Sequence, residues 1–338
     1  MRWRRWPWKG LAVLLCAFAP HTGTSGARAA DAPEQVGTGV VSTIDDESGF
    51  VLAPDGASAF FTKRSPTTNT PPRSVICVTR RINGRWGEPQ IAPFSGRYND
   101  FGVAISVGGR RIVFSSDRPN PAFADAAPNV DLWIVDRQGD AWSTPRNLGA
   151  PVNTPANEAY PSLAADGTLY FASTRPNGRG AADIYRARRV EGGYAQAENL
   201  ADINSPGYDS QPAVAPDQSF LVFSANDRGD ALSGGGAPYP RTDLYVSFRR
   251  GDGWTAPRNL GPAINSSASE STPSISADGR EFFFASDRGF ATVPMPRRLD
   301  AHEFDAALRS VNNGWSNIYR LPVSAIESRR EPMETLQP

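Results

Sequence analysis

Residues 274–288 read SISADGREFFFASDR, and this phrase decides the fold because it recurs along the chain. In it, an Asp-Gly turn separates two apolar segments and an arginine closes the second one. Asp-Gly between apolar strands is a strong hairpin signal, since glycine tolerates the positive φ of a tight turn. The turns of the five copies fall at residues 55, 108, 166, 217 and 278, so successive copies are 53, 58, 51 and 61 residues apart. Self-similarity at such a spacing predicts a repeat architecture.

Each copy continues with two further strands. The third strand opens with Asp or Asn ahead of an aromatic residue, at Asp131, Asp183, Asp243 and Asn317. After another tight turn, an aromatic marks the fourth strand, at Trp86, Trp142, Tyr194 and Trp254. Four short antiparallel strands describe one propeller blade, and a single blade cannot bury both of its faces. The sequence therefore predicts an all-β chain with a single β-propeller of five four-stranded blades; six blades is the alternative.

The ends of the chain predict how the ring closes. The last copy stops after its third strand near Pro322, whereas residues 37–48 resemble the end of a blade. We therefore expect the N-terminal segment to supply the missing outer strand, so that N- and C-terminal strands close the propeller together. The expected limits are a signal peptide over 1–30, the propeller over 37–323 and a polar C-terminal tail over 324–338.

The first thirty residues predict export. A basic stretch that ends at Lys9 precedes an apolar run over residues 11–19, and Ala27-Arg28-Ala29 reads as a small-residue cleavage site. The apolar run is too short to cross a bilayer, which takes about 20 residues. We expect cleavage near Ala29–Ala30, a periplasmic or secreted protein, and no integral membrane segment afterwards.

Charge and cysteine content narrow the classes of partner. Five of the 35 basic residues and none of the 35 acidic residues precede residue 31, which leaves a net charge of −5 after cleavage. No basic patch recommends nucleic acid as a partner. Cys77 is then the only cysteine, so no internal disulfide is expected. No cofactor is expected either, although a cation bound in the central channel stays open.

The stretch over residues 254–279, WTAPRNLGPAINSSASESTPSISADG, resembles the TolB-type, WD-repeat-like propeller repeat of exported bacterial proteins. The resemblance extends over nearly all of the chain after the signal peptide. It implies a periplasmic or cell-surface module that binds protein partners or ligands. As one fold hosts many functions, the resemblance speaks more strongly for the fold than for the activity.

Strand order places three repeated charges at one face. Successive strands are antiparallel, so the acid that begins the first strand, the arginine after the second and the Asp of the third lie together, opposite the Asp-Gly turns. The same face receives the loops that vary most, over residues 119–129, 176–182, 229–242 and 289–316. We expect one or two helical turns between Leu299 and Val311. Variable loops on a rigid frame are where binding sites usually develop.

The candidate binding-face charge ring consists of Glu47, Asp100, Glu158, Asp209 and Glu270 with Arg64, Arg118, Arg175, Arg228 and Arg288. One interpretation is that these charges pair within or between blades and position the strand ends. The other is that some line the central channel and coordinate a cation or polar ligand. Periodicity favours the first interpretation, because structural chemistry follows the repeat.

The aromatic residues also allow two interpretations, as packing between blades or as a surface that stacks on sugars. Trp133, Trp142 and Trp254 occupy repeating strand positions, which predicts inter-blade core rather than sugar stacking. Better surface candidates are loop aromatics, at Phe123, Tyr239 and Phe290.

Catalytic motifs are sparse. His302 is the only histidine after the signal peptide, and there is no Gly-x-Ser-x-Gly elbow and no set of zinc ligands. Glycosidase chemistry is the serious enzymatic alternative, since it needs only two carboxylates about 5–9.5 Å apart. The non-repeating acids lie in loops, at Asp125, Asp230, Asp300, Glu303 and Asp305. We expect a non-enzymatic binding or scaffolding module whose loops bind a protein, peptide or envelope glycan; the alternative is a glycosidase-type enzyme.

Overall fold

The computed structural model describes residues 32–65, 73–120, 122, 128–233, 241–289 and 297–330. Contacts divide the chain into residues 1–30 and residues 31–338, and every described residue belongs to the second unit. The expected signal peptide and its cleavage site lie outside the described residues. Within them, no helix has the length and apolar character needed to span a membrane.

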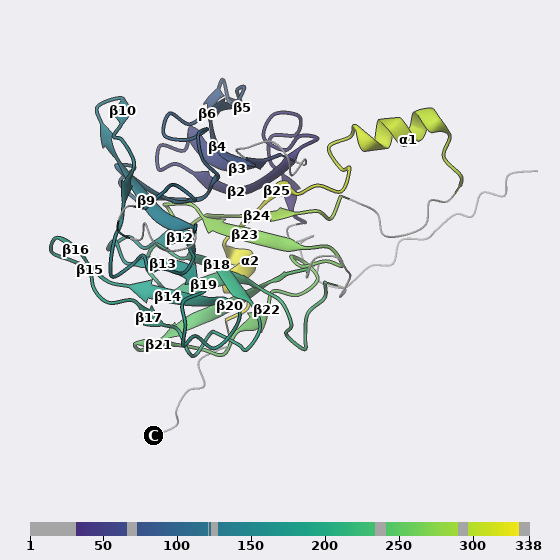
Figure 1. The fold of residues 1–338 in the computed structure, drawn as a ribbon. Helices are drawn as coiled ribbons and strands as arrows, with labels where there is room; N and C mark the ends of the chain where they lie inside the picture. Colours follow the sequence, from purple (N-terminus) through teal and green to yellow (C-terminus); the bar gives the residue numbers. More distant parts are fainter. Residues whose placement is uncertain are drawn as a thin grey trace, which may run out of the picture. The chain divides into compact units, whose positions relative to one another are not determined.

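The strands form five antiparallel blades (Figure 1). Blade 1 contains β2 (Asp46–Leu52), β3 (Ser58–Arg64), β4 (Ser74–Ile82), β5 (Arg85–Trp86) and β6 (Gln90–Ile91). Blade 2 contains β7 (Asp100–Ile105), β8 (Arg111–Ser116), β9 (Asp131–Gln138), β10 (Ala141–Trp142) and β11 (Arg146–Asn147). Blade 3 contains β12 (Glu158–Leu163), β13 (Leu169–Ser173), β14 (Asp183–Ala187) and β17 (Glu198–Asn199), with a small hairpin of β15 (Arg189–Val190) and β16 (Gly193–Tyr194). In blades 1 and 2, two short strands thus share the outermost position.

Blade 4 contains β18 (Asp209–Val214), β19 (Phe220–Ala225), β20 (Asp243–Arg250), β21 (Gly253–Trp254) and β22 (Arg258–Asn259). Blade 5 contains β23 (Glu270–Ile275), β24 (Glu281–Ser286) and β25 (Asn317–Pro322), and its outer strand is β1 (Glu34–Gln35). Gln35 pairs with Tyr319 in antiparallel register. The expected closure by strands from both ends is therefore confirmed, with the N-terminal strand slightly before residue 37.

The innermost strands show that the ring has five blades. β2, β7, β12, β18 and β23 contact one another in that order, and β23 contacts β2 again. This circle leaves no gap for another blade, so the five-bladed prediction is confirmed and the six-bladed alternative is wrong.

Strand register defines two faces. Glu270 lies opposite Ser286, and Ser286 lies opposite Asn317, so the acid, the end of the second strand and the start of the third share one end of the blade. We call this end, with its long loops, the loop face. The opposite end, with the turns at residues 55, 108, 166, 217 and 278, is the turn face. At the turn face Gly279 has φ +71°, as the tight turn requires.

The core lies between successive blades. Trp142 of blade 2 meets Phe60 of blade 1 edge-on at 6.2 Å between ring centroids, and Trp254 of blade 4 meets Tyr170 of blade 3 at 6.1 Å. Trp133 is also buried. Trp133 and Trp254 are therefore buried inter-blade core, and Trp142 packs against this core with part of its side chain exposed. The loop aromatics Phe123, Tyr239 and Phe290 lie outside the described residues.

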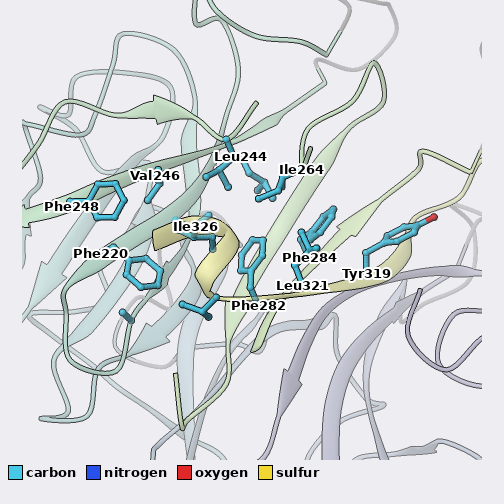
Figure 2. Packing of buried hydrophobic residues seen from close by; sticks show 14 residues of the cluster. Phe220, Leu244, Val246, Phe248, Ile264, Phe282, Phe284, Tyr319, Leu321 and Ile326 are labelled. Carbon is cyan, nitrogen blue, oxygen red and sulfur yellow. The ribbon is translucent and has the colours of Figure 1, made fainter. Parts of the chain in front are cut away.

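Two short helices complete the fold. Helix α1 (Ala301–Leu308) forms in the last loop, and Asp300 and Glu303 form a capping box at its start; none of its residues is buried. Helix α2 (Ser324–Glu327) begins where a polar tail was expected. Its Ile326 is completely buried between blades 4 and 5, among Phe220, Val246 and Phe282 (Figure 2). Core packing thus continues beyond residue 323.

Candidate functional site

Each inner strand carries a completely buried carboxylate at its first or second residue: Glu47, Asp100, Glu158, Asp209 and Glu270. In blades 2 to 5 the arginine after the second strand pairs with it, as Arg118, Arg175, Arg228 and Arg288. The Nη2 atom of Arg175 lies 3.2 Å from Glu158, and that of Arg288 lies 3.0 Å from Glu270. The structure thus brings eight of the ten charge-ring residues together as four buried ion pairs.

The same arginines tie neighbouring segments together. The guanidinium of Arg175 donates a hydrogen bond to the carbonyl of Val152 at 2.8 Å. It also stacks near two aromatic rings, 4.5 Å from Tyr185 and 5.3 Å from Phe171. A group with this many internal contacts is positioned by the protein and has little capacity left for a ligand.

Hydroxyl groups complete the environment of each carboxylate. Thr154 donates its backbone N–H at 2.8 Å and its hydroxyl at 2.7 Å to Glu158, and Ser266 bonds Glu270 in the same way. Burial raises the pKa of Glu158 above its ordinary value, while these hydrogen bonds and Arg175 oppose the rise. Because the buried oxygens of Glu158 and Glu270 have partners, the contacts support a structural role for these members of the charge ring.

Blade 1 departs from this arrangement. Glu47 pairs in register with Lys63, whose Nζ lies 4.0 Å from it, whereas Arg64 lies 4.0 Å from Asp46 instead. In blade 3, Ser173 lies opposite Glu158, and Arg175 follows two positions later. In blade 1, Lys63 lies opposite Glu47, so the position equivalent to Arg175 is Ser65. The expected partnership of Glu47 with Arg64 is therefore absent. Burial raises the pKa of Glu47 to about 7, against hydrogen bonds from Thr43.

The Asp that opens the third strand holds the variable loop. Asp183 accepts the backbone N–H groups of Arg179 and Gly180, and Asp243 accepts those of Leu232 and Ser233. An asparagine from the outer strand of the same blade also donates a side-chain hydrogen bond to each of them, Asn199 to Asp183 at 2.8 Å and Asn259 to Asp243 at 2.7 Å. The sequence analysis identified the repeated third-strand Asp but missed that it bonds this asparagine and anchors the loop.

The central channel is narrow and uncharged. Val51, Val103, Pro161, Pro212 and Pro273 surround it, and its two cavities measure about 50 and 30 Å³. Neither cavity is lined by a charge-ring residue. Among the described residues, no three His, Cys, Asp or Glu side chains group as metal ligands would. The described part of the channel therefore offers neutral side chains and backbone to a small guest.

A bulge in every inner strand surrounds the loop-face end of this channel. The bulged residues all have positive φ: Gly49, Gly102, Tyr160, Gln211 and Thr272. The Gln211 side chain accepts a hydrogen bond from the backbone of Thr272, and the Thr272 hydroxyl accepts one from Gly49, both across blade boundaries. Positive φ is unfavourable for threonine, so these inter-blade bonds explain why a residue other than glycine is held there.

Three of the non-repeating loop acids, Asp230, Asp300 and Glu303, make local contacts. Asp300 and Glu303 cap α1, and Glu303 also pairs with Arg297. Asp230 accepts a hydrogen bond from the Tyr245 hydroxyl at 2.9 Å. Asp305 is exposed on α1, and Asp125 lies outside the described residues.

Exposed apolar side chains gather beside α1. Ile44, Phe304, Leu308 and Trp315 are 42–55% exposed, and we call them the loop-face apolar patch. The Asn313 side chain donates hydrogen bonds to the carbonyls of Ile44 and Leu308, at 2.8 and 3.3 Å, which ties α1 to the start of blade 1. Exposed apolar clusters on soluble proteins commonly mark interaction sites.

No family model matches the chain, and no curated protein matches its sequence. Among solved structures, it is similar to α-L-arabinofuranosidase from Lactobacillus brevis, with 14% identity, a TM-score of 0.50, and coverage of 84% of this chain and 91% of that one. It is also similar to a TolB described as putative from Agrobacterium tumefaciens, with 17% identity, a TM-score of 0.40, and coverage of 70% and 87%. A puromycin-hydrolyzing peptidase of Mycobacterium tuberculosis has 17% identity and a TM-score of 0.39, with coverage of 75% and 38%. At these identities the likeness concerns the fold alone.

Proposed function

We propose that the chain is an exported binding or scaffolding module of the bacterial periplasm or cell envelope, and that its loop face binds a protein, peptide or envelope glycan. The loop-face apolar patch is the observation that carries the proposal. Eight large hydrophobic side chains are exposed among the described residues, and five of them lie at the loop face: Ile44, Leu232, Phe304, Leu308 and Trp315. The exposed apolar side chains are therefore concentrated at the loop face, where the loops depart from the repeat.

The patch is supported by a pre-formed backbone. The capping box satisfies the start of α1, and the Arg297–Glu303 pair holds the preceding segment against the helix. An interface that is ordered before binding loses less conformational entropy when a partner arrives. Phe304 and Leu308, one helical turn apart, thus present a fixed pair of apolar anchors to a partner.

The alternative is a glycosidase-type, carbohydrate-active enzyme. Such an enzyme needs two accessible carboxylates about 5–9.5 Å apart. The five repeated acids that would be the natural supply are completely buried, and four of them are paired with arginine. These contacts favour binding over catalysis. Turnover of any glycan in a broad panel, abolished by substitution of one loop carboxylate, would instead establish the alternative.

Affinity capture from envelope extract tests the binding proposal. The immobilised protein is compared with the variant Phe304→Asp/Leu308→Asp and with the control Ile82→Asp, whose isoleucine in β4 is 66% exposed and lies away from the patch. We expect a partner that the unaltered protein and the control retain and the double variant loses. Equal capture by all three would remove the loop-face apolar patch from the proposal.

A further inference from the structure

The residues around the loop-face end of the central channel depart from the repeat in three neighbouring blades. We call them the channel mouth, and they are the residues directly before, directly after and two positions after each buried acid. In blades 1 to 5 the residue directly after the acid is Ser48, Phe101, Ala159, Ser210 and Ser271. Phe101 is thus a large apolar side chain at a position that the other blades keep small, and it is partly exposed.

Tyr160 is the second departure, and its backbone is strained. It is the bulge residue of blade 3, with φ +54°, where a bulky side chain is unfavourable. Blades 1 and 2 have glycine at this position, and in blades 4 and 5 the side chains of Gln211 and Thr272 accept the inter-blade hydrogen bonds described above. Among the described residues, the Tyr160 hydroxyl makes no such bond; its backbone N–H donates to Ser115. A strained residue without a structural hydrogen bond of its side chain points to a functional role.

The Phe101 and Tyr160 rings meet across the boundary between blades 2 and 3. Their centroids lie 5.2 Å apart, with an angle of 58° between the ring planes. Gly102 leaves room for this contact, since a Cβ atom there would lie 3.1 Å from the Tyr160 ring. In blade 4, burial raises the pKa of Tyr208, and the neighbouring Tyr160 adds to the rise. Three partly exposed rings from consecutive blades therefore form an aromatic side of the channel mouth.

Hydroxyl groups lie on the other side of the channel mouth. Ser48 in blade 1 and Ser271 in blade 5 occupy the repeat position of Phe101, and both are partly exposed. Below the mouth the channel has only cavities of about 50 and 30 Å³, so a ligand of more than a few atoms rests on the mouth. The mouth thus offers aromatic rings on one side and hydroxyl groups on the other.

The channel mouth is nearly neutral. Asp46 is its charged member, and Arg64 lies 4.0 Å from the Asp46 carboxylate. Asp117 and Asp287, which follow second strands, each accept a backbone N–H group of the mouth. A strongly charged ligand would therefore find little unpaired charge of the opposite sign here.

A neutral sugar ring matches this set of groups. One face of a pyranose consists of C–H bonds that pack on an aromatic ring, and its hydroxyl groups exchange hydrogen bonds with serine side chains. Phe101 and Tyr160 belong to β7 and β12, so their positions are fixed by the sheet before a ligand arrives. Such pre-organisation reduces the entropy lost on binding.

We propose that the channel mouth binds one neutral sugar unit of an envelope glycan, stacked on Phe101 and Tyr160 and hydrogen-bonded by Ser48 and Ser271. Tyr208 completes the aromatic side. The inference rests on the proposed function, because it names a glycan as a loop-face ligand, but it uses no residue of the loop-face apolar patch. Capture of a partner through that patch and binding of a sugar at the mouth are measured separately, so either can fail alone.

Isothermal titration calorimetry of the full chain tests the proposal, with neutral trisaccharides of glucose, galactose, mannose and N-acetylglucosamine as probes. We expect saturable binding of at least one of them. Tyr160→Gly introduces the residue that blades 1 and 2 carry, so it removes the ring and relieves the strained backbone. Phe101→Ser introduces the residue that blades 1, 4 and 5 carry. Each variant should bind the sugar at least about tenfold more weakly, the effect of losing a central stacking contact.

Ile91→Ser is the matched control. It removes an apolar side chain that is 54% exposed on β6, the outer strand of blade 1, and it should leave the affinity for the sugar unchanged. Thermal unfolding of each variant verifies that it is folded.

Three results would overturn the proposal. The first is the absence of saturable binding for every trisaccharide, whatever envelope capture shows. The second is binding that neither Tyr160→Gly nor Phe101→Ser weakens, which would place the sugar elsewhere on the chain. The third is a short proline-rich peptide that binds where no saccharide does and is lost in both variants, because proline-rich segments also dock on aromatic surfaces.

Discussion

Glu47 makes the closure of the ring sensitive to pH, and Glu47→Gln tests this directly. The carboxyl is completely buried, its nearest cation is Lys63 at 4.0 Å, and burial raises its pKa from 4.5 to about 7. A carboxyl with a raised pKa holds its proton more tightly in the folded chain. Between those two pH values the unfolded chain has lost the proton and the folded chain keeps it, so the free energy of unfolding falls as pH rises and levels off above about pH 7.

The size of this effect follows from the shift. The difference between 4.5 and about 7 corresponds to about 3 kcal/mol of unfolding free energy, lost between mildly acidic and mildly alkaline pH. Glu47 now accepts hydrogen bonds from the backbone N–H and the hydroxyl of Thr43. Gln at this position imitates the protonated carboxyl, because its amide oxygen can accept the Thr43 N–H while its amide nitrogen donates to the Thr43 hydroxyl. The variant should therefore lack this contribution to pH dependence.

Urea unfolding followed by tryptophan fluorescence, at about pH 5 and about pH 8, measures the difference. Because the unfolded carboxyl is already mostly deprotonated at pH 5, we expect Glu47→Gln to gain about 2.5 kcal/mol relative to the unaltered protein over that interval. The matched control is Glu158→Gln, which leaves Arg175 without its buried counter-charge and should cost about 3–5 kcal/mol. Parallel pH profiles for Glu47→Gln and the unaltered protein would refute the reasoning.

Three further predictions concern packing and the loops. Trp254→Ala removes the ring packed edge-on against Tyr170 and should lower the free energy of unfolding by about 3–5 kcal/mol, whereas Ile82→Ala at an exposed position should change it by less than about 0.5 kcal/mol in the same denaturant titration. Ile326→Ala should cost about 2–4 kcal/mol, with exposed Phe304→Ala as its control; equal effects would contradict the burial of α2. Asp183→Ala removes the acceptor for the backbone of Arg179 and Gly180, so trypsin should cleave after Arg179 faster than in the unaltered chain, and an unchanged cleavage rate would show that other contacts hold this loop.

The sequence was sufficient to predict the blades, their number and the two faces, because these depend on local patterns. Asp-Gly turns such as Asp278-Gly279 and the apolar strands beside them act over a few residues, and repetition makes them unmistakable. The same regularity predicted correctly that Trp142 and Trp254 belong to the core. Closure of the ring was predictable as well, since the last copy of the repeat stops after its third strand, β25, and residues 37–48 resemble the end of a blade.

Other features depend on contacts that no local pattern records. Arg64 and Lys63 differ by one position, which is enough to exchange the partners of Glu47 and Asp46. Helix α2 is four residues long with a single buried aliphatic side chain, too short for a periodic signal. The residues that the third and outer strands pair also differ from blade to blade, as Val78 with Gln90 in blade 1 and Arg186 with Glu198 in blade 3, and this comparison needs the register of the strands.

The pairing of β1 with β25 also orders events during synthesis of the chain. The first strand of the propeller waits for the last one, nearly three hundred residues later in the chain, before either edge is covered. Until then, the growing chain carries an uncovered inner surface on blade 1 and an unpaired outer strand position, both of which invite pairing with other chains. A holding factor that shields the nascent protein is therefore most needed until residues 317–322 emerge, and once they pair, the ends of the ring protect each other.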